Sequence, residues 1–227
     1  ALPPDLDDPG LLRGLAGALR ELRAAGLVLA YHDRSDGGLF ATLVEMAFAG
    51  HCGLRIELPP ARRHAFAELF AEELGVVLQV RSADLDRIVG TFAKHGLGSD
   101  AVMAIGRPDA RDARISIRAG DQVLDESWED LKRAWSETSF LMRELRDDPA
   151  CAREEFEATT SWQAPPLQVA LAFDAAEDVA APFVARGVRP KVAVLREQGV
   201  NSQSEMAAAF DRAGFEAHDV HMTDLIG

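Results

Sequence analysis

Hydrophobic and polar positions alternate with two different periods along the first 125 residues. Leucines recur at helical spacing between residues 11 and 25, and Gly26 follows at a point where a helix can end. The apolar run 27–31 then predicts a buried strand, and the nearly continuous apolar run 39–49 predicts a helix that is buried on several sides. The polar segment between these two runs therefore lies at a strand-to-helix junction.

The pattern beyond residue 50 continues to mix strands with helices. Short alternating or apolar runs predict strands, and longer amphipathic runs predict helices. Because the loops between them are short, residues 1–125 are expected to form one domain of the α/β or α+β class, a mixed sheet with covering helices. The expected strands are 54–58, 76–80, 101–105 and 114–118, and the expected helices are 64–74 and 83–95.

A long amphipathic helix is expected next, over residues 127–148. Its apolar residues share one helical face, and Pro149 opposes continuation of the helix. The pattern weakens between residues 159 and 189, where prolines interrupt alanine-rich stretches. We therefore expect residues 126–187 to form a helical linker. The shared apolar face consists of Trp128, Leu131, Trp135, Met142 and Leu145.

A new pattern begins after the linker. An apolar strand at 191–195, a polar turn with Gly199, a helix at 204–213 and a strand at 215–221 together predict a βαβ unit. One βαβ unit cannot cover both faces of a parallel sheet. We therefore expect residues 188–227 to be the truncated start of a larger domain.

Composition and charge narrow the classes of function. Apolar residues make up 48% of the chain and charged residues 27%, and no apolar run is long enough to cross a bilayer. The N-terminal residues lack the basic and apolar regions of a secretion signal. The two cysteines, Cys52 and Cys151, form neither a disulfide framework nor a zinc motif, so a cytoplasmic protein is expected. The net charge of −13 argues against nucleic acid as a partner, and no membrane partner is expected.

The segment AYHDRSDGG, residues 30–38, concentrates polar chemistry at the strand-to-helix junction. In an extended chain Asp33 and Ser35 point to one side, and His32 and Arg34 point to the other. A carboxylate with a hydroxyl offers the oxygen ligands that suit Mg²⁺. The two glycines would let a phosphate group approach the N-terminus of the following helix. These features describe a site for magnesium and a nucleotide phosphate.

A purely structural interpretation of the same segment stays open, and spacing alone favours it. Ser35 or Asp36 could cap the following helix, since short polar side chains accept hydrogen bonds from the first free N–H groups. Asp33 could instead pair with Arg34 or Arg55 on the surface. Short motifs match by chance often enough that the site needs further support.

Three other polar positions are expected to be structural. A lone histidine after an apolar strand, such as His32, is more often hydrogen-bonded in place than catalytic. Glu45 lies among apolar neighbours and must meet a cation, a backbone donor or a site, because an unpaired buried carboxylate is costly. Glu72 follows an amphipathic run near the end of an expected helix and is expected to be solvated.

Four stretches of the sequence resemble the family of large, single-chain phosphoribosylformylglycinamidine synthases. The first, AYHDRSDGGLFATLVEMAFAGHCGL, is similar to the start of the family's second C-terminal domain of the aminoimidazole ribonucleotide synthetase superfamily. The resemblance continues through FAEELGVVLQV and SWEDLKRAWSETSFLMRELRDDPACAREE. The last stretch, RPKVAVLREQGVNSQSEMAAAFDRAGFEAHDVHMTDL, is similar to the start of the family's class I glutaminase domain. Together the four stretches extend over essentially the whole chain.

The resemblance implies an ATP-dependent carbon–nitrogen ligase of purine biosynthesis. The family converts formylglycinamide ribonucleotide, glutamine and water to formylglycinamidine ribonucleotide and glutamate, using ATP and Mg²⁺. Asp33 resembles the family's Mg²⁺ ligand, and Ser35 resembles its ATP-contacting residue. The nucleotide at this position, ATP or ADP, is either turned over or retained for structure. The remaining domains of the same polypeptide are the expected protein partners.

No catalytic residue is assigned within this chain. The family's glutaminase uses a cysteine nucleophile with histidine and glutamate partners, which are expected beyond Gly227, so the chain by itself is expected to be inactive. Neither Cys52 nor Cys151 lies in the glutaminase-like segment. Two other functions stay open: a scaffold region of the enzyme that only holds a nucleotide, and another ATP-using member of the same superfamily, such as an aminoimidazole ribonucleotide, selenophosphate or thiamine-phosphate enzyme. The glutaminase-like segment argues against the second.

Overall fold

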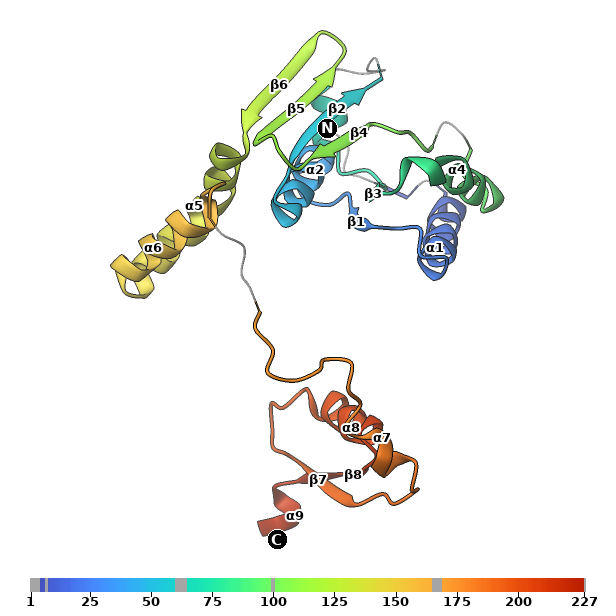
Figure 1. Ribbon diagram of the computed structural model, residues 1–227, viewed down its shortest axis with the longest axis vertical. Coiled ribbons are helices and arrows are strands. Elements are labelled where there is room, and N and C mark those ends of the chain that lie inside the picture. Colours follow the sequence, from blue (N-terminus) through green and yellow to red (C-terminus); the bar gives the residue numbers. More distant parts are fainter. Residues whose placement is uncertain (1–4, 7, 60–64, 99–100, 165–168, 227) are drawn as a thin grey trace. The chain divides into compact units, whose positions relative to one another are not determined.

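The chain folds into two compact units, residues 1–165 and residues 166–227, and each is described by itself. Figure 1 shows the elements of both units along the sequence. The sequence-based boundaries at 125/126 and 187/188 remain a prediction. None of the helices in the described parts of the chain is long and apolar enough to cross a membrane. The computed structural model describes residues 5–6, 8–59, 65–98, 101–164 and 169–226.

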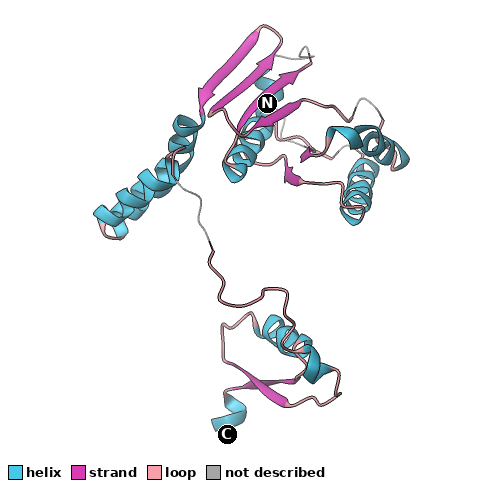
Figure 2. Ribbon diagram, viewed as in Figure 1, coloured by secondary structure: helices cyan, strands magenta, loops and turns pink. Residues whose placement is uncertain are grey.

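A four-stranded mixed sheet forms the centre of the first unit (Figure 2). Strand β2 (Gly53–Leu58) lies between two neighbours. It pairs antiparallel with β4 (Gly106–Asp109) and parallel with β5 (Arg114–Ala119). Strand β6 (Gln122–Ser127) pairs antiparallel with β5 and completes the order β4-β2-β5-β6. The expected mixed α/β sheet is confirmed.

Helix α2 (Gly38–Gly50) packs on one face of this sheet. Strand β2 buries alternate residues from Leu54 to Leu58, as a strand with one covered face does. The indole Nε1 of Trp128 donates to the carbonyl oxygen of Ala47 at 3.2 Å. This hydrogen bond attaches the helix that begins at Trp128 to α2. The buried core comprises Leu43, Val44, Ala47, Leu54, Ile56, Leu58, Leu69, Ile115, Ile117, Ala119 and Trp128.

A second, smaller core forms around two helices that pack together (Figure 1). Helix α1 (Pro9–Ala24) contacts helix α4 (Leu85–Lys94), which follows the short 3₁₀ helix η1 (Ser82–Asp84). Beside them lies a two-stranded antiparallel sheet of β1 (Ala30–Asp33) and β3 (Val76–Gln79). The buried residues of this core are Leu15, Ala18, Leu22, Leu27, Ile88 and Phe92.

The expected long helix is present as α5 (Trp128–Arg146). The chain then reverses, because Asp148 caps a further helix, α6 (Pro149–Thr160), and Pro149 occupies its first position. Three ion pairs join α5 to α6 in antiparallel order. Of the apolar face of α5, Trp128 is buried, whereas Met142 and Leu145 are 67% and 90% exposed. The three pairs are Arg133–Glu157, Arg143–Glu155 and Arg153–Glu144.

The second unit contains the expected βαβ arrangement. Strands β7 (Lys191–Arg196) and β8 (Glu216–His221) pair in parallel and are connected by helix α8 (Gln203–Arg212). Val194 is buried at 5% exposure, but α8 has no buried residue. Two short helices flank the arrangement, α7 (Ala181–Val184) and α9 (Thr223–Ile226).

Several expected boundaries differ from the structure. The strand expected at 101–105 is wrong, because the strand in this region is β4, which begins at Gly106. Gly106 has a φ of 158°, and a side chain there would collide with the carbonyl oxygen of Arg55. Strand β6 was missed because its exposed, mostly polar residues carry little apolar alternation. The first strand starts three residues later than expected, at Ala30. The helix expected over 64–74 is α3 (Ala65–Phe70), and its predicted start at residue 64 lies outside the described residues.

Candidate functional site

The candidate site is the turn that connects β1 to α2. Asp33 is the last residue of β1, and its side chain is 64% exposed. Ser35 and Asp36 follow in the turn and are also exposed. Because β1 ends at Asp33, the strand alternation that grouped Asp33 with Ser35 does not extend over Ser35. Both side chains nevertheless present oxygen atoms to solvent within one turn.

Two glycines shape the entry into α2. Gly37 and Gly38 have φ angles of 80° and 65°, in the left-handed region that residues with a Cβ avoid. A Cβ on Gly38 would lie 2.7 Å from the carbonyl oxygen of Leu69 and 2.9 Å from that of Ala71. The backbone of the turn therefore packs directly against the end of α3 (Ala65–Phe70) and the residue that follows it.

Arg34 attaches the turn to the same neighbouring segment. Its backbone N–H donates to the carbonyl oxygen of Gly75 at 2.8 Å. Its guanidinium donates from Nε to the carbonyl oxygen of Glu73 at 2.6 Å and from Nη2 to that of Leu74 at 3.2 Å. Burial lowers the pKa of Arg34, and the charge of Glu73 opposes that shift. The arginine is thus engaged by backbone carbonyls and does not serve as the ion-pair partner of Asp33.

Glu72, from the same neighbouring segment, contacts the glycine turn through its side chain. The backbone N–H of Gly37 donates to Glu72 Oε1 at 2.9 Å. Sequence analysis missed this role, since acidic residues near the end of a helix are usually solvated. The available signal was the similarity of the stretch FAEELG to the same family as the turn itself. The contact satisfies a backbone donor at the start of α2.

His32 and Thr42 fix the carbonyl group of Asp33. His32 Nδ1 lies 2.6 Å from this oxygen, and Nδ1 must be the donor because a carbonyl oxygen only accepts. Thr42 is buried, and its Oγ1 donates to the same oxygen at 3.3 Å and to the Gly38 carbonyl oxygen at 2.9 Å. The backbone at Asp33 is held in place while its carboxylate stays open to solvent.

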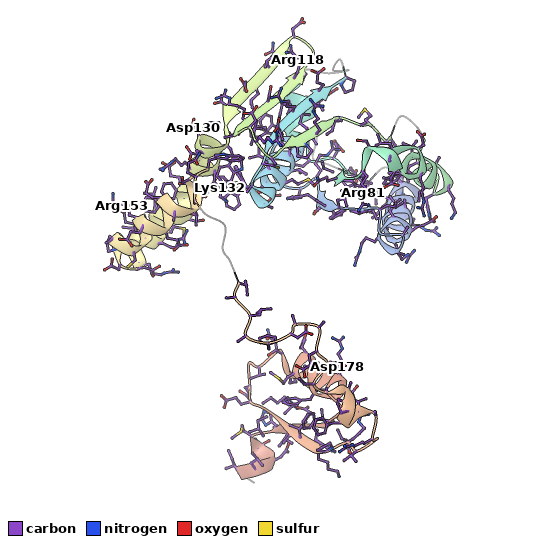
Figure 3. All side chains as sticks on the ribbon, viewed as in Figure 1. Arg81, Arg118, Asp130, Lys132, Arg153 and Asp178 are labelled. Atoms are coloured by element: carbon purple, nitrogen blue, oxygen red, sulfur yellow. The ribbon has the colours of Figure 1, made fainter. Side chains whose placement is uncertain are left out.

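Glu45 meets two partners, as a half-buried carboxylate requires. Its Oε2 lies 2.9 Å from His32 Nε2, and its Oε1 accepts from the indole Nε1 of Trp135 at 2.9 Å. Lys132 places its Nζ 4.2 Å from the centre of the Trp135 ring (Figure 3 labels Lys132 on α5). Burial lowers the pKa of Lys132, and the charge of Glu45 acts in the opposite direction.

The capping alternative is wrong for α2. Gly37, which has no side chain, occupies the N-cap position, so neither Ser35 nor Asp36 has that role. The proposed surface partner Arg55 contacts Asp109 and Asp112 instead. Both structural explanations for the polarity of the turn are therefore removed, apart from the 3.8 Å approach of Asp33 Oδ1 to His32 Nδ1.

The turn meets the requirements of a magnesium ion only in part. Within the described ranges, no group of three or more His, Cys, Asp or Glu side chains could enclose a metal. Mg²⁺ does not require such a group, since it is commonly bound through one or two carboxylates with water and phosphate oxygens. One exposed carboxylate on a fixed backbone fits that manner of binding.

The two cysteines are free and have raised pKa values. Burial raises the pKa of Cys52. For Cys151 the main cause is the charge of Asp148, whose carboxylate caps α6. Both environments disfavour the thiolate, which is the nucleophilic form.

Two family models match parts of this chain. The model of the AIR synthase related protein, C-terminal domain, matches residues 2–117. The model of the CobB/CobQ-like glutamine amidotransferase domain matches residues 189–227. The first match contains the candidate site, and the second contains the βαβ arrangement.

Solved structures from Thermotoga maritima are also similar. The structure titled PurL complexed with ATP is 17% identical, with 55% of this chain and 22% of that chain covered and a TM-score of 0.47. Phosphoribosylformylglycinamidine synthase II is 18% identical, with 54% and 21% covered and a TM-score of 0.46. The structure titled PurLQS is 19% identical, with 55% and 22% covered and a TM-score of 0.47. The chain spans about a fifth of the length of these proteins.

Proposed function

The chain belongs to the family of AIR synthase related proteins, through that family's C-terminal domain, and on this premise we propose that it is part of a phosphoribosylformylglycinamidine synthase. The proposed enzyme converts formylglycinamide ribonucleotide, glutamine and water to formylglycinamidine ribonucleotide and glutamate at the expense of ATP. The observation that carries the proposal is the order of the two family matches. A synthetase-type domain at 2–117 is followed in one chain by a glutamine amidotransferase match at 189–227.

The same order distinguishes the proposed enzyme from other ATP-using members of the superfamily. An aminoimidazole ribonucleotide, selenophosphate or thiamine-phosphate enzyme has no use for a glutamine-derived amino group. A ligase that forms an amidine needs ammonia. Because residues 189–227 match a glutamine amidotransferase domain, glutamine is the proposed source of that ammonia. The nucleophile of that half-reaction is not assigned to Cys52 or Cys151, because the segment contains neither.

Within the chain, we assign the nucleotide chemistry to the turn between β1 and α2. Asp33 would hold Mg²⁺ through its exposed carboxylate, and Ser35 would contact the nucleotide through its hydroxyl. A bound Mg²⁺ supplies charge neutralisation for phosphate oxygens. The left-handed glycines bring no side chain of their own to the start of α2, where the Glu72 carboxylate accepts from the Gly37 N–H, so a phosphate would be held mainly through the Mg²⁺ on Asp33.

The experiment uses the full-length protein and two matched substitutions in the same turn. Asp33→Asn removes the carboxylate charge with little change in size, and Asp36→Asn makes the same change at an exposed neighbour that is not assigned to the site. Binding of Mg-ADP is measured by calorimetric titration, and amidine formation is measured with glutamine and with ammonium as nitrogen donors. We expect Asp33→Asn to lose most nucleotide binding and activity with both donors, and Asp36→Asn to retain both.

The outcomes separate the alternatives. Unchanged nucleotide binding in Asp33→Asn would remove Asp33 from the site. Full turnover by a variant that has lost the nucleotide and melts at a lower temperature would assign this nucleotide a structural role. A full-length protein that binds Mg-ADP but forms no amidine from either nitrogen donor would contradict the proposed reaction.

A further inference from the structure

A continuous chain of polar contacts connects α5 to the candidate metal ligand. The indole Nε1 of Trp135 donates to Glu45 Oε1 at 2.9 Å, and Glu45 Oε2 lies 2.9 Å from His32 Nε2. The other nitrogen of the same ring, His32 Nδ1, donates to the carbonyl oxygen of Asp33 at 2.6 Å. Three elements, α5, α2 and β1, each contribute one side chain to this path.

The contacts restrict the position of every side chain in the path. Both oxygens of Glu45 and both nitrogens of His32 have a partner, so a rotation of either side chain breaks a hydrogen bond. Trp135 is 56% exposed, yet Lys132 lies over its ring and Phe48 packs against its edge at 5.9 Å between ring centres. The indole is therefore contacted by two side chains even though much of its surface is open.

We infer that Trp135 and Glu45 are positioning residues for the metal-binding carboxylate of Asp33, acting through His32. The inference rests on the proposed function, because it concerns the same Mg-nucleotide site. Neither residue touches the proposed ligand. Their effect is to fix the imidazole that holds the peptide group of Asp33, and so to set the direction in which the Asp33 carboxylate leaves the end of β1.

The physical reason is that Mg²⁺ accepts only a narrow range of ligand geometry. A single carboxylate at the end of a two-stranded sheet would otherwise sample many directions, and binding would pay for ordering it. Partners one shell away from a metal ligand commonly change metal affinity by about 10- to 100-fold when they are removed. Trp135 and Glu45 occupy such positions relative to Asp33.

The test measures Mg²⁺ dependence of ADP binding in the full-length protein. Trp135→Phe keeps an aromatic ring for packing but removes the N–H donor, and Glu45→Leu keeps a side chain of similar size but removes both oxygens that contact Trp135 and His32. We expect both variants to need about tenfold more Mg²⁺ for half-maximal ADP binding at a fixed ADP concentration. Trp162→Phe is the matched control, because Trp162 stacks on His51 at 4.6 Å between ring centres and is no member of the path.

Each outcome supports or overturns the inference. A raised Mg²⁺ requirement in Trp135→Phe and Glu45→Leu, with an unchanged requirement in Trp162→Phe, supports it. If Asp33→Asn weakens Mg-dependent binding but the two positioning variants match the parent protein, the site stands and the inference fails. If Asp33→Asn has no effect on Mg-dependent ADP binding, both the proposed site and the inference fail. Equal losses of thermal stability in the Trp135 and Trp162 variants, with no change in Mg²⁺ requirement, would show a packing role only. Glu45→Leu decides the question if Trp135→Phe does not fold.

Discussion

The chain contains two polar strand-to-helix turns that each carry a glycine, and the two turns differ in their contacts with the rest of the protein. The first connects β1 to α2 through residues 34–37, and the second connects β7 to α8 through residues 197–202. Each has a polar turn with a glycine in the left-handed conformation, Gly37 at 80° and Gly199 at 86°. A local pattern alone would rank them as equal candidates for a binding site.

The difference lies in contacts with distant parts of the sequence. The first turn donates hydrogen bonds to the segment 72–75, and its flanking residue His32 contacts Glu45. The second turn shows a local backbone bond, from Val200 N to the carbonyl oxygen of Glu197 at 3.3 Å. A Cβ on Gly199 would meet nothing within 4 Å. In the first turn, hydrogen bonds to distant residues fix the backbone, while side chains of the turn stay exposed.

The largest expected difference comes from replacing one glycine in each turn by alanine. Gly38→Ala forces a Cβ against backbone atoms of the segment 69–71 in a left-handed conformation, and we expect it to destabilise the first unit by about 3 kcal/mol. Gly199→Ala faces only the conformational cost, about 1 kcal/mol. Tryptophan fluorescence during urea unfolding reports the first unit, since all three tryptophans lie there, and hydrogen exchange reports the second. Equal losses would show that the two turns are constrained alike.

A smaller difference is expected from two arginines, Arg34 in the first turn and Arg196 at the end of the strand that precedes the second. Arg34→Ala removes two donors to backbone carbonyls and should destabilise the first unit by about 1–2 kcal/mol in the same unfolding experiment. Arg196→Ala removes an exposed ion pair with Asp219 and should leave hydrogen exchange in the second unit unchanged. An Arg34→Ala variant as stable as the parent would mean that water replaces the guanidinium without cost.

The smallest expected effect concerns Glu72. Glu72→Ala removes the acceptor for the Gly37 N–H, and we expect a loss of about 1 kcal/mol together with faster exchange of the Gly37 amide hydrogen. Glu72→Gln retains a carbonyl oxygen and should restore slow exchange. If the glutamine variant exchanges as fast as the alanine variant, the negative charge matters more than the hydrogen bond.

The elements with a strong period were predictable from sequence, and those defined by pairing were not. The leucine spacing in α1 and the apolar run in α2 predicted both helices, and the alternation in β2 predicted that strand. Strand β6 carries exposed residues and exists because its backbone pairs with β5. A strand at the edge of a sheet needs no apolar alternation, so the sequence contains little signal for it.

The candidate site divides in the same way. Strand alternation and the resemblance to a known family identified Asp33 and Ser35 as candidates, although the strand itself ends at Asp33. The partners of the turn could not be predicted from the sequence. Arg34 donates to the carbonyl oxygens of Glu73 and Leu74, which lie 39 and 40 positions later in the chain. The same holds for the pair Glu45 and Trp135, which lie 90 positions apart.

The sequence by itself determined which chemical groups stand at the turn and that two glycines permit its conformation, because residue type and backbone preference are local properties. It also determined the order of a mixed sheet followed by a βαβ unit. Only the tertiary structure decided that the backbone of Asp33 is held while its carboxylate is exposed, and that Gly37 rather than Ser35 or Asp36 occupies the N-cap of α2. Those outcomes depend on hydrogen bonds between segments that the chain brings together only when it packs its core.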